Sequence, residues 1–290
     1  MSKTVTVLGN GQLALAMLDK LRASGLDTLQ MCRPEFDITD PDCIQRISAH
    51  TAFVVNCIAY NDVDGAEDDT KAAEAVNFHA VARLAKYCAA QRLMLVHVST
   101  DFVFDGLGRA PYREDDKAEP VSAYGASKLF GEEAVAEEMG DLPYLIVRTS
   151  SLWTDHPARR NNFPYKIMQR VLEGKVSWVL RGRQMVPTFA PHLADGIIAL
   201  LDFQFANKRS KDHIYHITNS GPVVSWYEFA STFCSAHKVP NHKRLIQPTW
   251  KWESKAVRPL YSALSSEKFT CRTEHEMPTW MDSIKEVAES

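Results

Sequence analysis

Two stretches of the chain carry side chains whose chemistry suits proton transfer. The first is Ser99-Thr100, which follows an apolar run of strand length at residues 93–98. The second holds Tyr124 and Lys128, which lie four residues apart in a segment with helical spacing and therefore share one helix face. Because chemistry in open α/β sheets lies beyond the carboxyl ends of the strands, we expect these hydroxyl, phenol and ammonium groups to meet there.

Such a group of side chains suits the reduction of a ketone. Hydride delivered to carbon leaves negative charge on the carbonyl oxygen, so a positioned acid must supply a proton as that charge develops. A free phenol holds its proton tightly at neutral pH, and a neighbouring cation would lower the pKa of Tyr124. We predict that Lys128 is that cation and that Thr100, or Ser99 beside it, holds the substrate oxygen. Taken alone, the Tyr and Lys spacing also fits an ordinary amphipathic helix.

A glycine turn directly after the first strand predicts a dinucleotide site. Residues 4–8 form a β-branched run, which breaks at Gly9, Gly11 and Gln12 before apolar residues continue at helical spacing. In a strand, turn and helix of this kind, glycines let backbone amides approach a pyrophosphate at the helix N-terminus. The alternative is that these glycines serve backbone angles alone.

Two polar residues further along add to this prediction. The next strand candidate, residues 28–32, ends at Arg33, and an arginine at that place accommodates a 2′-phosphate. Arg33 therefore favours NADP(H), with NAD(H) as the second option, although a solvated loop arginine is the alternative. Asn77 lies beside the apolar face of a long helix expected over about residues 66–90, where it either bridges to strand ends or stays exposed.

Strands and helices alternate through the first half of the chain, which predicts an α/β fold with a doubly wound parallel sheet of the Rossmann type. We expect residues 1–150 to form an NADP-binding domain and residues 151–290 to form mainly a smaller, C-terminal substrate-binding lobe. Two later strands, near residues 176–180 and 213–217, are expected to return to the sheet.

Composition narrows the function further. A net charge of −3 and a pI near 6.4 give no basic surface for nucleic acid or a membrane. The six cysteines are scattered without paired spacing, which favours a reducing, cytoplasmic location. The histidines show no ligand spacing, so we expect no metal site. A solvated helix face, not a carboxylate site, is expected for Glu132, Glu133, Glu137 and Glu138.

The chain resembles the extended short-chain dehydrogenases and, within them, the dTDP-4-dehydrorhamnose reductases. The resemblance runs nearly end to end and rests on many matches in the same order. They are Val55-Asn56-Cys57-Ile58-Ala59-Tyr60, Val63-Asp64, Ala66-Glu67, Val76-Asn77, Ser99 to Gly106, Pro111-Tyr112 before Glu114-Asp115, Tyr124 to Lys128 with Gly131-Glu132, Arg148-Thr149-Ser150, Asn161-Asn162-Phe163, Pro187-Thr188, Ser225 to Ala230, Arg258-Pro259, Ser262-Ala263-Leu264, and Pro278 with Trp280.

This resemblance implies reduction, by NADPH or NADH, of the 4-keto group of a dTDP-linked 6-deoxy-hexulose, the last step to dTDP-L-rhamnose. It maps the catalytic triad onto Thr100, Tyr124 and Lys128. The residues expected at the dinucleotide are Gly9, Gly11, Gln12, Leu13, Arg33, Asp37, Ile38, Ala59, Tyr60, Asn77, Tyr124 and Lys128. Those expected near the nucleotide-sugar substrate are Ser99, Asp101, Phe102, Val103, Asn162 and Arg258. A homodimer is compatible with the sequence, which does not decide the oligomeric state.

Three departures from the family pattern are visible. The glycine turn is one residue shorter than the usual Gly-x-x-Gly-Gln-x-Gly. Ser151 stands where the family often has Trp, and Trp153 follows two residues later. The approach to Pro187-Thr188 reads Arg183-Gln184-Met185-Val186, where the family usually shows Asp-Gln-x-Gly-x. These changes leave the cofactor preference and the particular deoxyhexulose open.

Two other functions use the same scaffold. Nucleotide-sugar epimerases and 4,6-dehydratases are the first, and the dehydratases place Glu after the Thr-Asp pair. Phe102 stands there in this chain, and an apolar ring cannot transfer a proton. Non-catalytic regulatory subunits that bind NADP(H), such as that of methionine adenosyltransferase, are the second. The retained Thr100, Tyr124 and Lys128 favour an enzyme.

Overall fold

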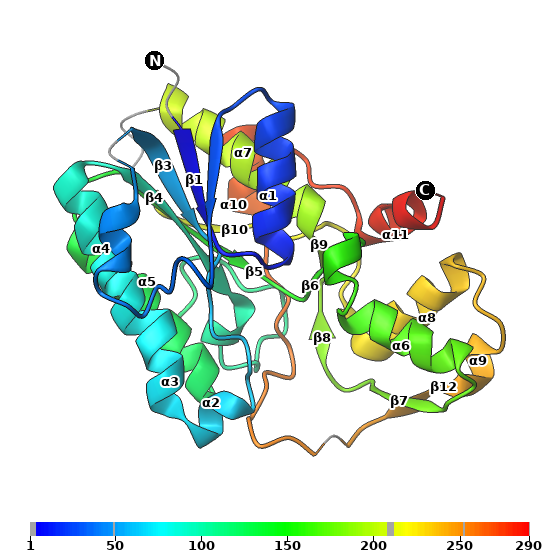
Figure 1. Ribbon diagram of the computed structural model, residues 1–290. Coiled ribbons are helices and arrows are strands. Elements are labelled where there is room, and N and C mark those ends of the chain that lie inside the picture. The colour runs from blue at the N-terminus through cyan, green and yellow to red at the C-terminus, as the bar shows by residue number, and fades with distance from the viewer. Residues whose placement is uncertain (1–3, 49, 208–211, 252, 290) are drawn as a thin grey trace.

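The computed structural model describes residues 4–48, 50–207, 212–251 and 253–289, and it has a larger and a smaller lobe (Figure 1). The larger lobe is built on a six-stranded parallel sheet with the strand order β10-β5-β4-β3-β1-β2. Its strands are β1 (Thr4–Leu8), β2 (Thr28–Met31), β3 (Thr51–Asn56), β4 (Met94–Thr100), β5 (Tyr144–Thr149) and β10 (Ile214–His216). The predicted α/β, doubly wound parallel sheet is confirmed.

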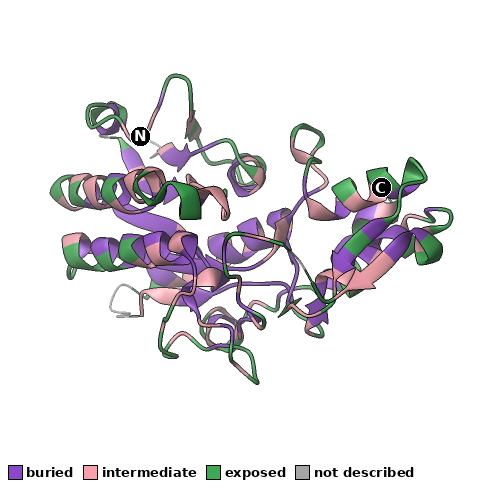
Figure 2. Cartoon of the chain, turned by 90° about the horizontal axis from the view of Figure 1, so that it is seen from below, coloured by how far each residue is buried: buried purple, intermediate pink, exposed green. Residues whose placement is uncertain are grey.

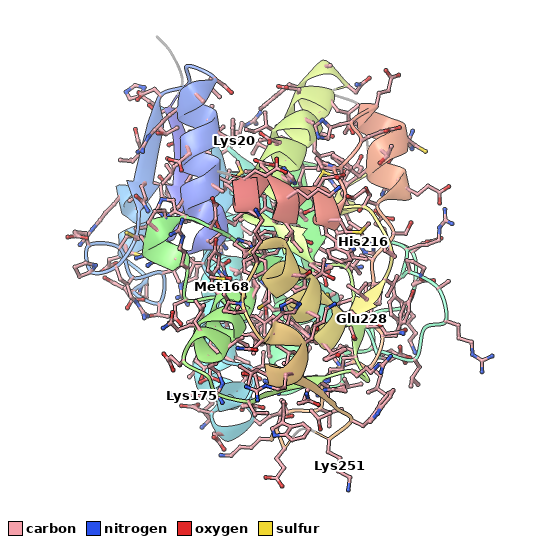
Figure 3. All side chains as sticks on the ribbon, turned by 90° about the vertical axis from the view of Figure 1, so that its right-hand side faces the viewer. Lys20, Met168, Lys175, His216, Glu228 and Lys251 are labelled. Carbon is pink, nitrogen blue, oxygen red and sulfur yellow. The ribbon has the colours of Figure 1, made fainter. Side chains whose placement is uncertain are left out.

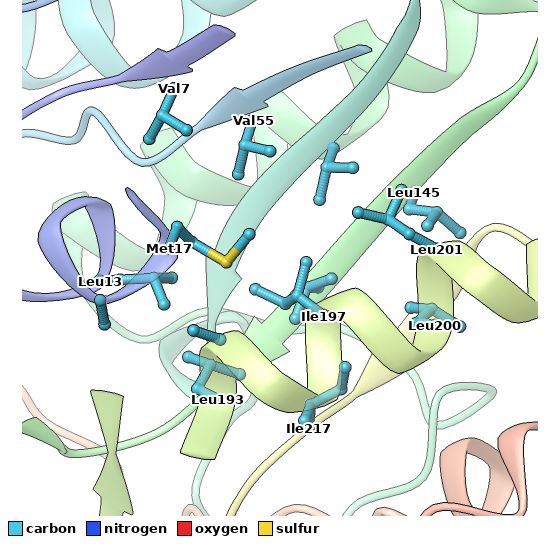
Figure 4. Close-up of a cluster of buried hydrophobic side chains, with 14 of the residues drawn as sticks. Val7, Leu13, Met17, Val55, Leu145, Leu193, Ile197, Leu200, Leu201 and Ile217 are labelled. Atoms are coloured by element: carbon cyan, nitrogen blue, oxygen red, sulfur yellow. The ribbon is translucent and has the colours of Figure 1, made fainter. Parts of the chain in front are cut away.

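Helices cover both faces of this sheet, which is why its strands are apolar on both sides. On one face lie α1 (Gln12–Ala23), α7 (Ala190–Ala206) and α10 (Glu267–Thr273), and on the other lie α4 (Ala80–Gln91) and α5 (Ala123–Met139) (Figure 1). Figure 4 shows the core on the first face, where Met17 of α1 and Ile197 of α7 point toward Val7 and Val55 of the sheet.

The helix expected over residues 66–90 is interrupted. It consists of α2 (Gly65–Asp68), α3 (Thr70–Glu74), a π-helical turn at Ala75–His79, and α4. Asp69 makes the first break, because its backbone leaves the helical region and its carboxylate instead accepts a hydrogen bond of 3.0 Å from the Ala72 amide. The π turn carries Asn77, and turns of this kind often occur at functional sites.

The smaller lobe is formed mainly by helices and two-stranded sheets from the second half of the chain. Its helices are α6 (Phe163–Leu172), α8 (Trp226–Ala236), α9 (His242–Leu245) and α11 (Trp280–Glu289). Its strand pairs are β6 (Leu152–Trp153) with β9 (Thr188–Phe189), β7 (Ser177–Leu180) with β12 (Ile246–Thr249), and β8 (Gln184–Met185) with β11 (Val224–Ser225).

The expected return of residues 176–180 to the central sheet is wrong. The segment does form β7, but β7 pairs with β12 in the smaller lobe. In β7 buried and exposed residues alternate, with Trp178 exposed, as suits a strand covered on one face only. The other expected return is correct, because β10 pairs with β5.

Each lobe has its own buried interior, drawn in purple in Figure 2. In the smaller lobe the interior is largely aromatic and contains Trp153, Phe189, Phe229 and Phe233. Figure 3 views this lobe from its outer side, with Lys175 and Lys251 at the end of the molecule opposite Lys20. Within the described ranges, no helix combines the length and the apolar character needed to cross a bilayer.

Candidate active site

The glycine turn lies at the place where the sheet order reverses, between the carboxyl ends of β1 and β3. Gly9 has φ +109°, a conformation that side-chain-bearing residues rarely adopt. Gly11 precedes α1, and no side chain caps the first amides of that helix. Because these amides are uncapped and dipole-positive, they can bind an anion.

A cavity of about 390 Å³ opens at this turn. Six of the residues predicted to contact a dinucleotide line it, namely Gly9, Gly11, Arg33, Ile38, Ala59 and Tyr60. The uncapped amides on one wall and a guanidinium on another suit a ligand with phosphate groups. The residues present therefore fit a phosphorylated dinucleotide.

The other residues predicted for this ligand do not line the cavity. Leu13 is buried in the core between α1 and the sheet, and Gln12 is the first residue of α1. Asp37 forms an ion pair with Arg33 (3.0 Å), and hydrogen bonds from Arg33 and Thr39 lower the pKa of Asp37 to about 2.

Asn77 lies behind the wall of this cavity and holds the backbone of Tyr60, one of the lining residues. It is fully buried, and its amide oxygen accepts a hydrogen bond from the Tyr60 backbone N–H (2.9 Å). Its amide nitrogen donates to the Tyr60 carbonyl (3.1 Å) and to Ser127 Oγ on α5 (3.0 Å). Asn77 therefore fixes the loop after β3 to α5.

Thr100 and Tyr124 meet at the carboxyl end of β4. The Thr100 side chain lies close enough to the phenol to oppose the rise of its pKa, and Thr100 Oγ1 accepts a hydrogen bond from the Phe102 backbone N–H (3.2 Å). Tyr124 belongs to a small apolar cluster against which Tyr60 packs, and Tyr60 lines the cavity at the glycine turn. The Tyr124 ring also contacts the ring of Phe102 (5.6 Å between centroids), which lines a second and larger cavity. Neighbours of Tyr124 therefore line both cavities, although Tyr124 itself lines neither.

The expected lowering of the pKa of Tyr124 is wrong. Burial removes the phenol from water and raises its pKa to about 12, and nearby Asp101 adds to this effect. Lys128 lies on the same helix but its Nζ donates to the Val98 carbonyl (2.7 Å). Burial also lowers the pKa of Lys128 to about 8.

His97 lies beside Lys128 in a fully buried polar group. The His97 Nε2 and Lys128 Nζ atoms are 3.4 Å apart, and His97 Nδ1 lies 3.1 Å from the Asn56 side-chain nitrogen. Burial, and then the nearby ammonium, hold the pKa of His97 well below its ordinary value. His97 is therefore neutral here and adds no positive charge next to Lys128.

Glu132 corrects the prediction of a solvated glutamate face. Glu133 and Glu137 are exposed, but Glu132 is only 3% exposed and forms a bidentate ion pair with Arg148 on β5 (2.6 and 3.0 Å). The Ser99 hydroxyl donates to the same carboxylate. Because the Ser99 hydroxyl is directed to Glu132, Thr100 is the better placed of the two hydroxyls to act beside the phenol.

The larger cavity has a volume of about 690 Å³ and lies between the two lobes. Of the residues predicted to be near a sugar nucleotide, Asp101, Phe102 and Arg258 line it. Val103 is instead packed in a small apolar core, and the Asn162 amide donates to the carbonyls of Thr154 (2.7 Å) and Arg159.

Asp101 is a buried carboxyl group at the edge of this cavity. Its oxygens accept hydrogen bonds from Thr100 Oγ1 (3.1 Å) and Ser150 Oγ (3.0 Å), and the nearby Ser262 hydroxyl also favours the charged form. Burial nevertheless dominates and raises the pKa of Asp101 to about 6. Within the described residues, no cluster of His, Cys, Asp or Glu has the geometry to hold a metal ion.

Comparisons with known proteins agree with this arrangement. The family model "RmlD substrate binding domain" matches residues 3–290. A dTDP-4-dehydrorhamnose reductase of Burkholderia thailandensis is 34% identical, over 97% of this chain and 96% of that protein, and one of Mycobacterium tuberculosis is 32% identical, over 98% and 91%. A crystal structure of a dTDP-4-dehydrorhamnose reductase from Bacillus anthracis in complex with NADP is 27% identical, with a TM-score of 0.87 over 99% of both chains. The chain belongs to the RmlD family.

Two of the departures from the RmlD family pattern lie at the larger cavity. Ser151 lines the cavity with a backbone φ of +47°, whereas Trp153 is buried in the core of the smaller lobe, 4.6 Å from the Phe189 ring. Arg183 lines the cavity from the segment before β8. The third departure, the short glycine turn, forms part of the smaller cavity.

Proposed function

We propose that the chain is an NADPH-dependent reductase of the 4-keto group of a dTDP-linked 6-deoxy-hexulose, as in the formation of dTDP-L-rhamnose. The observation that carries the proposal is that neighbours of Tyr124 line two cavities, one suited to a phosphorylated dinucleotide and one large enough for a nucleotide sugar. Membership of the RmlD family supports the reaction, and the related B. anthracis reductase was crystallised with NADP.

In this proposal Tyr124 Oη donates a proton to the keto oxygen while Thr100 Oγ1 holds that oxygen in place by a hydrogen bond. NADPH, when bound, supplies the hydride. Lys128 is one helical turn from Tyr124, and because its pKa is about 8 it can exchange a proton near neutral pH. In the structure the Thr100 hydroxyl donates its hydrogen to Asp101 (3.1 Å), so in this proposal the hydroxyl turns from Asp101 to the keto oxygen when the substrate binds.

The test is an assay of nicotinamide absorbance with NADPH and dTDP-4-keto-L-rhamnose, with UDP-linked keto sugars in parallel. Tyr124→Phe keeps the ring but removes the acid, so turnover should fall by about a hundredfold or more. Tyr87→Phe is the matched control, because Tyr87 lies on α4, its hydroxyl donates to the Ile47 carbonyl, and it lines neither cavity. Near-normal turnover in Tyr124→Phe would remove this phenol from the mechanism.

The same assay separates the alternatives. A wild-type protein that binds NADPH tightly but oxidises it with no keto sugar would be a binding subunit. A dehydratase would convert a dTDP-hexose without net oxidation of NADPH, but the position after Asp101 holds Phe102, which offers no proton.

We also propose a cytoplasmic location and a homodimer. All six cysteines are free thiols, as expected in a reducing compartment.

On the outer face of α5, Phe130 is 40% exposed and packs against Phe78 (5.8 Å between ring centroids), which gives an apolar surface for a second copy. Light scattering of the purified protein, with Phe130→Ser as the variant, tests the assembly.

A further inference from the structure

The larger cavity carries an excess of positive charge. Four cationic side chains line it, namely Lys166, Arg170, Arg183 and Arg258. Among the described residues, the only acidic side chain that lines it is Asp101. An excess of positive charge of this kind favours an anionic ligand.

Two of these cations already have partners in the protein. Arg258 forms a bidentate ion pair with Asp64, with nitrogen–oxygen distances of 2.9 and 3.1 Å. Arg170 donates hydrogen bonds to Ser177 Oγ and to the Val176 carbonyl, each 3.2 Å long. Lys166 is exposed to solvent.

Arg183 differs from them. Within the described part of the chain its side chain forms neither an ion pair nor a hydrogen bond, and its Nε is shielded from solvent without an acceptor. Burial, together with the charge of Arg258, lowers the pKa of Arg183 to about 10, and the Asp64 carboxylate, which pairs with Arg258, opposes this shift only in part. A guanidinium held in this way gains a counter-charge when an anion enters the cavity.

The backbone holds Arg183 and Arg258 on neighbouring segments of the wall. Next to Arg183, the Gln184 N–H donates to the Leu260 carbonyl, and the Ser262 N–H donates to the Gln184 carbonyl, each at 2.8 Å. The two segments run parallel at this point. Both guanidinium groups therefore reach the same cavity from adjacent positions.

We propose that Arg183 binds the diphosphate of the nucleotide sugar, with Arg258 as the second guanidinium beside it. The inference rests on the proposed function, since it takes a nucleotide sugar as the ligand. The planar guanidinium presents parallel N–H donors that match two phosphate oxygens, and no acceptor among the described residues bonds its Nε.

Calorimetric titration with dTDP, and with UDP in parallel, tests the inference on the wild type and on Arg183→Gln, Arg183→Lys and Arg181→Gln. Arg181 is the matched control, because its guanidinium lies 5.7 Å from the Tyr227 ring and does not line the cavity. We expect Arg183→Gln to weaken binding of the diphosphate about 10- to 100-fold, with Arg183→Lys intermediate. Arg181→Gln should bind like the wild type, and NADPH affinity should be the same in all variants.

Three results would overturn the inference. They are diphosphate affinity in Arg183→Gln within about twofold of wild type, an equal loss in Arg181→Gln, and failure of both nucleotides to bind the wild-type protein. Kinetics separate this inference from the proposed function. If no keto sugar is reduced but Arg183→Gln loses dTDP binding, only the proposed function fails. If the reductase is active and Arg183→Gln leaves KM unchanged, only the role of Arg183 fails.

Discussion

Removing the charge of Glu132 should destabilise the protein strongly. Arg148 and Glu132 are only 4% and 3% exposed, and the Arg148 guanidinium donates hydrogen bonds to both oxygens of the Glu132 carboxylate. In Glu132→Gln the shape is kept, but Arg148 becomes a buried cation without a counter-charge, which costs about 3–5 kcal/mol. For a chain of 290 residues the unfolding entropy is about 0.6 kcal/mol/K, so Tm should fall by about 5–8 °C.

Thermal unfolding followed by circular dichroism measures this loss. The control is Glu133→Gln, the exposed neighbour on the same helix, which should leave Tm unchanged. A double variant, Glu132→Leu with Arg148→Met, should recover part of the lost stability, because it removes both buried charges but leaves the buried Ser99 hydroxyl without its acceptor. A Tm for Glu132→Gln within about 1 °C of wild type would show that the pair adds no stability and would refute this reasoning.

Three more predictions concern the two cavities. Burial raises the pKa of Asp101 to about 6, so the charged carboxylate destabilises the fold above that pH, and this cost vanishes toward pH 4. The free energy of unfolding of Asp101→Asn relative to wild type should therefore rise by about 2–3 kcal/mol between pH 4 and pH 8, as measured by urea titration. A difference that stays constant with pH would contradict this prediction. A Cβ at Gly131 would lie 2.2 Å from the Asn77 carbonyl oxygen, so Gly131→Ala should cost about 1–3 kcal/mol and weaken NADPH binding by calorimetry, whereas wild-type values would refute the close contact. Arg33→Ala should weaken NADPH binding more than NADH binding by fluorescence titration, and equal losses would argue against a 2′-phosphate contact.

The strands of the larger lobe could be predicted because each is a short apolar run between helices. The same signal at residues 177–180 predicted a strand correctly but not its partner. Pairing with β12 depends on a segment some seventy positions later, about which the local pattern carries no information. The break at Asp69 was missed for a related reason, since one local carboxylate bond outweighs the helical pattern around it.

The positions of Thr100 and Tyr124 follow from sequence because a strand end and one helix face determine them. The burial of Glu132 could also have been found: it lies four residues after Lys128, on the face already assigned to the site, and Arg148 is a charged residue in an otherwise apolar strand. The pKa of Tyr124 could not, because it depends on how far the fold removes the phenol from water. Arg183 gave no signal beyond its departure from the family pattern.

Tyr124, Lys128 and Glu132 are successive members of one stripe along α5, each a turn beyond the last. A single codon inserted or deleted between Ser122 and Tyr124 would rotate the whole stripe by about 100° about the helix axis and turn all three groups away together. Length variation among descendants of this chain should therefore accumulate in surface loops and be absent from the start of α5.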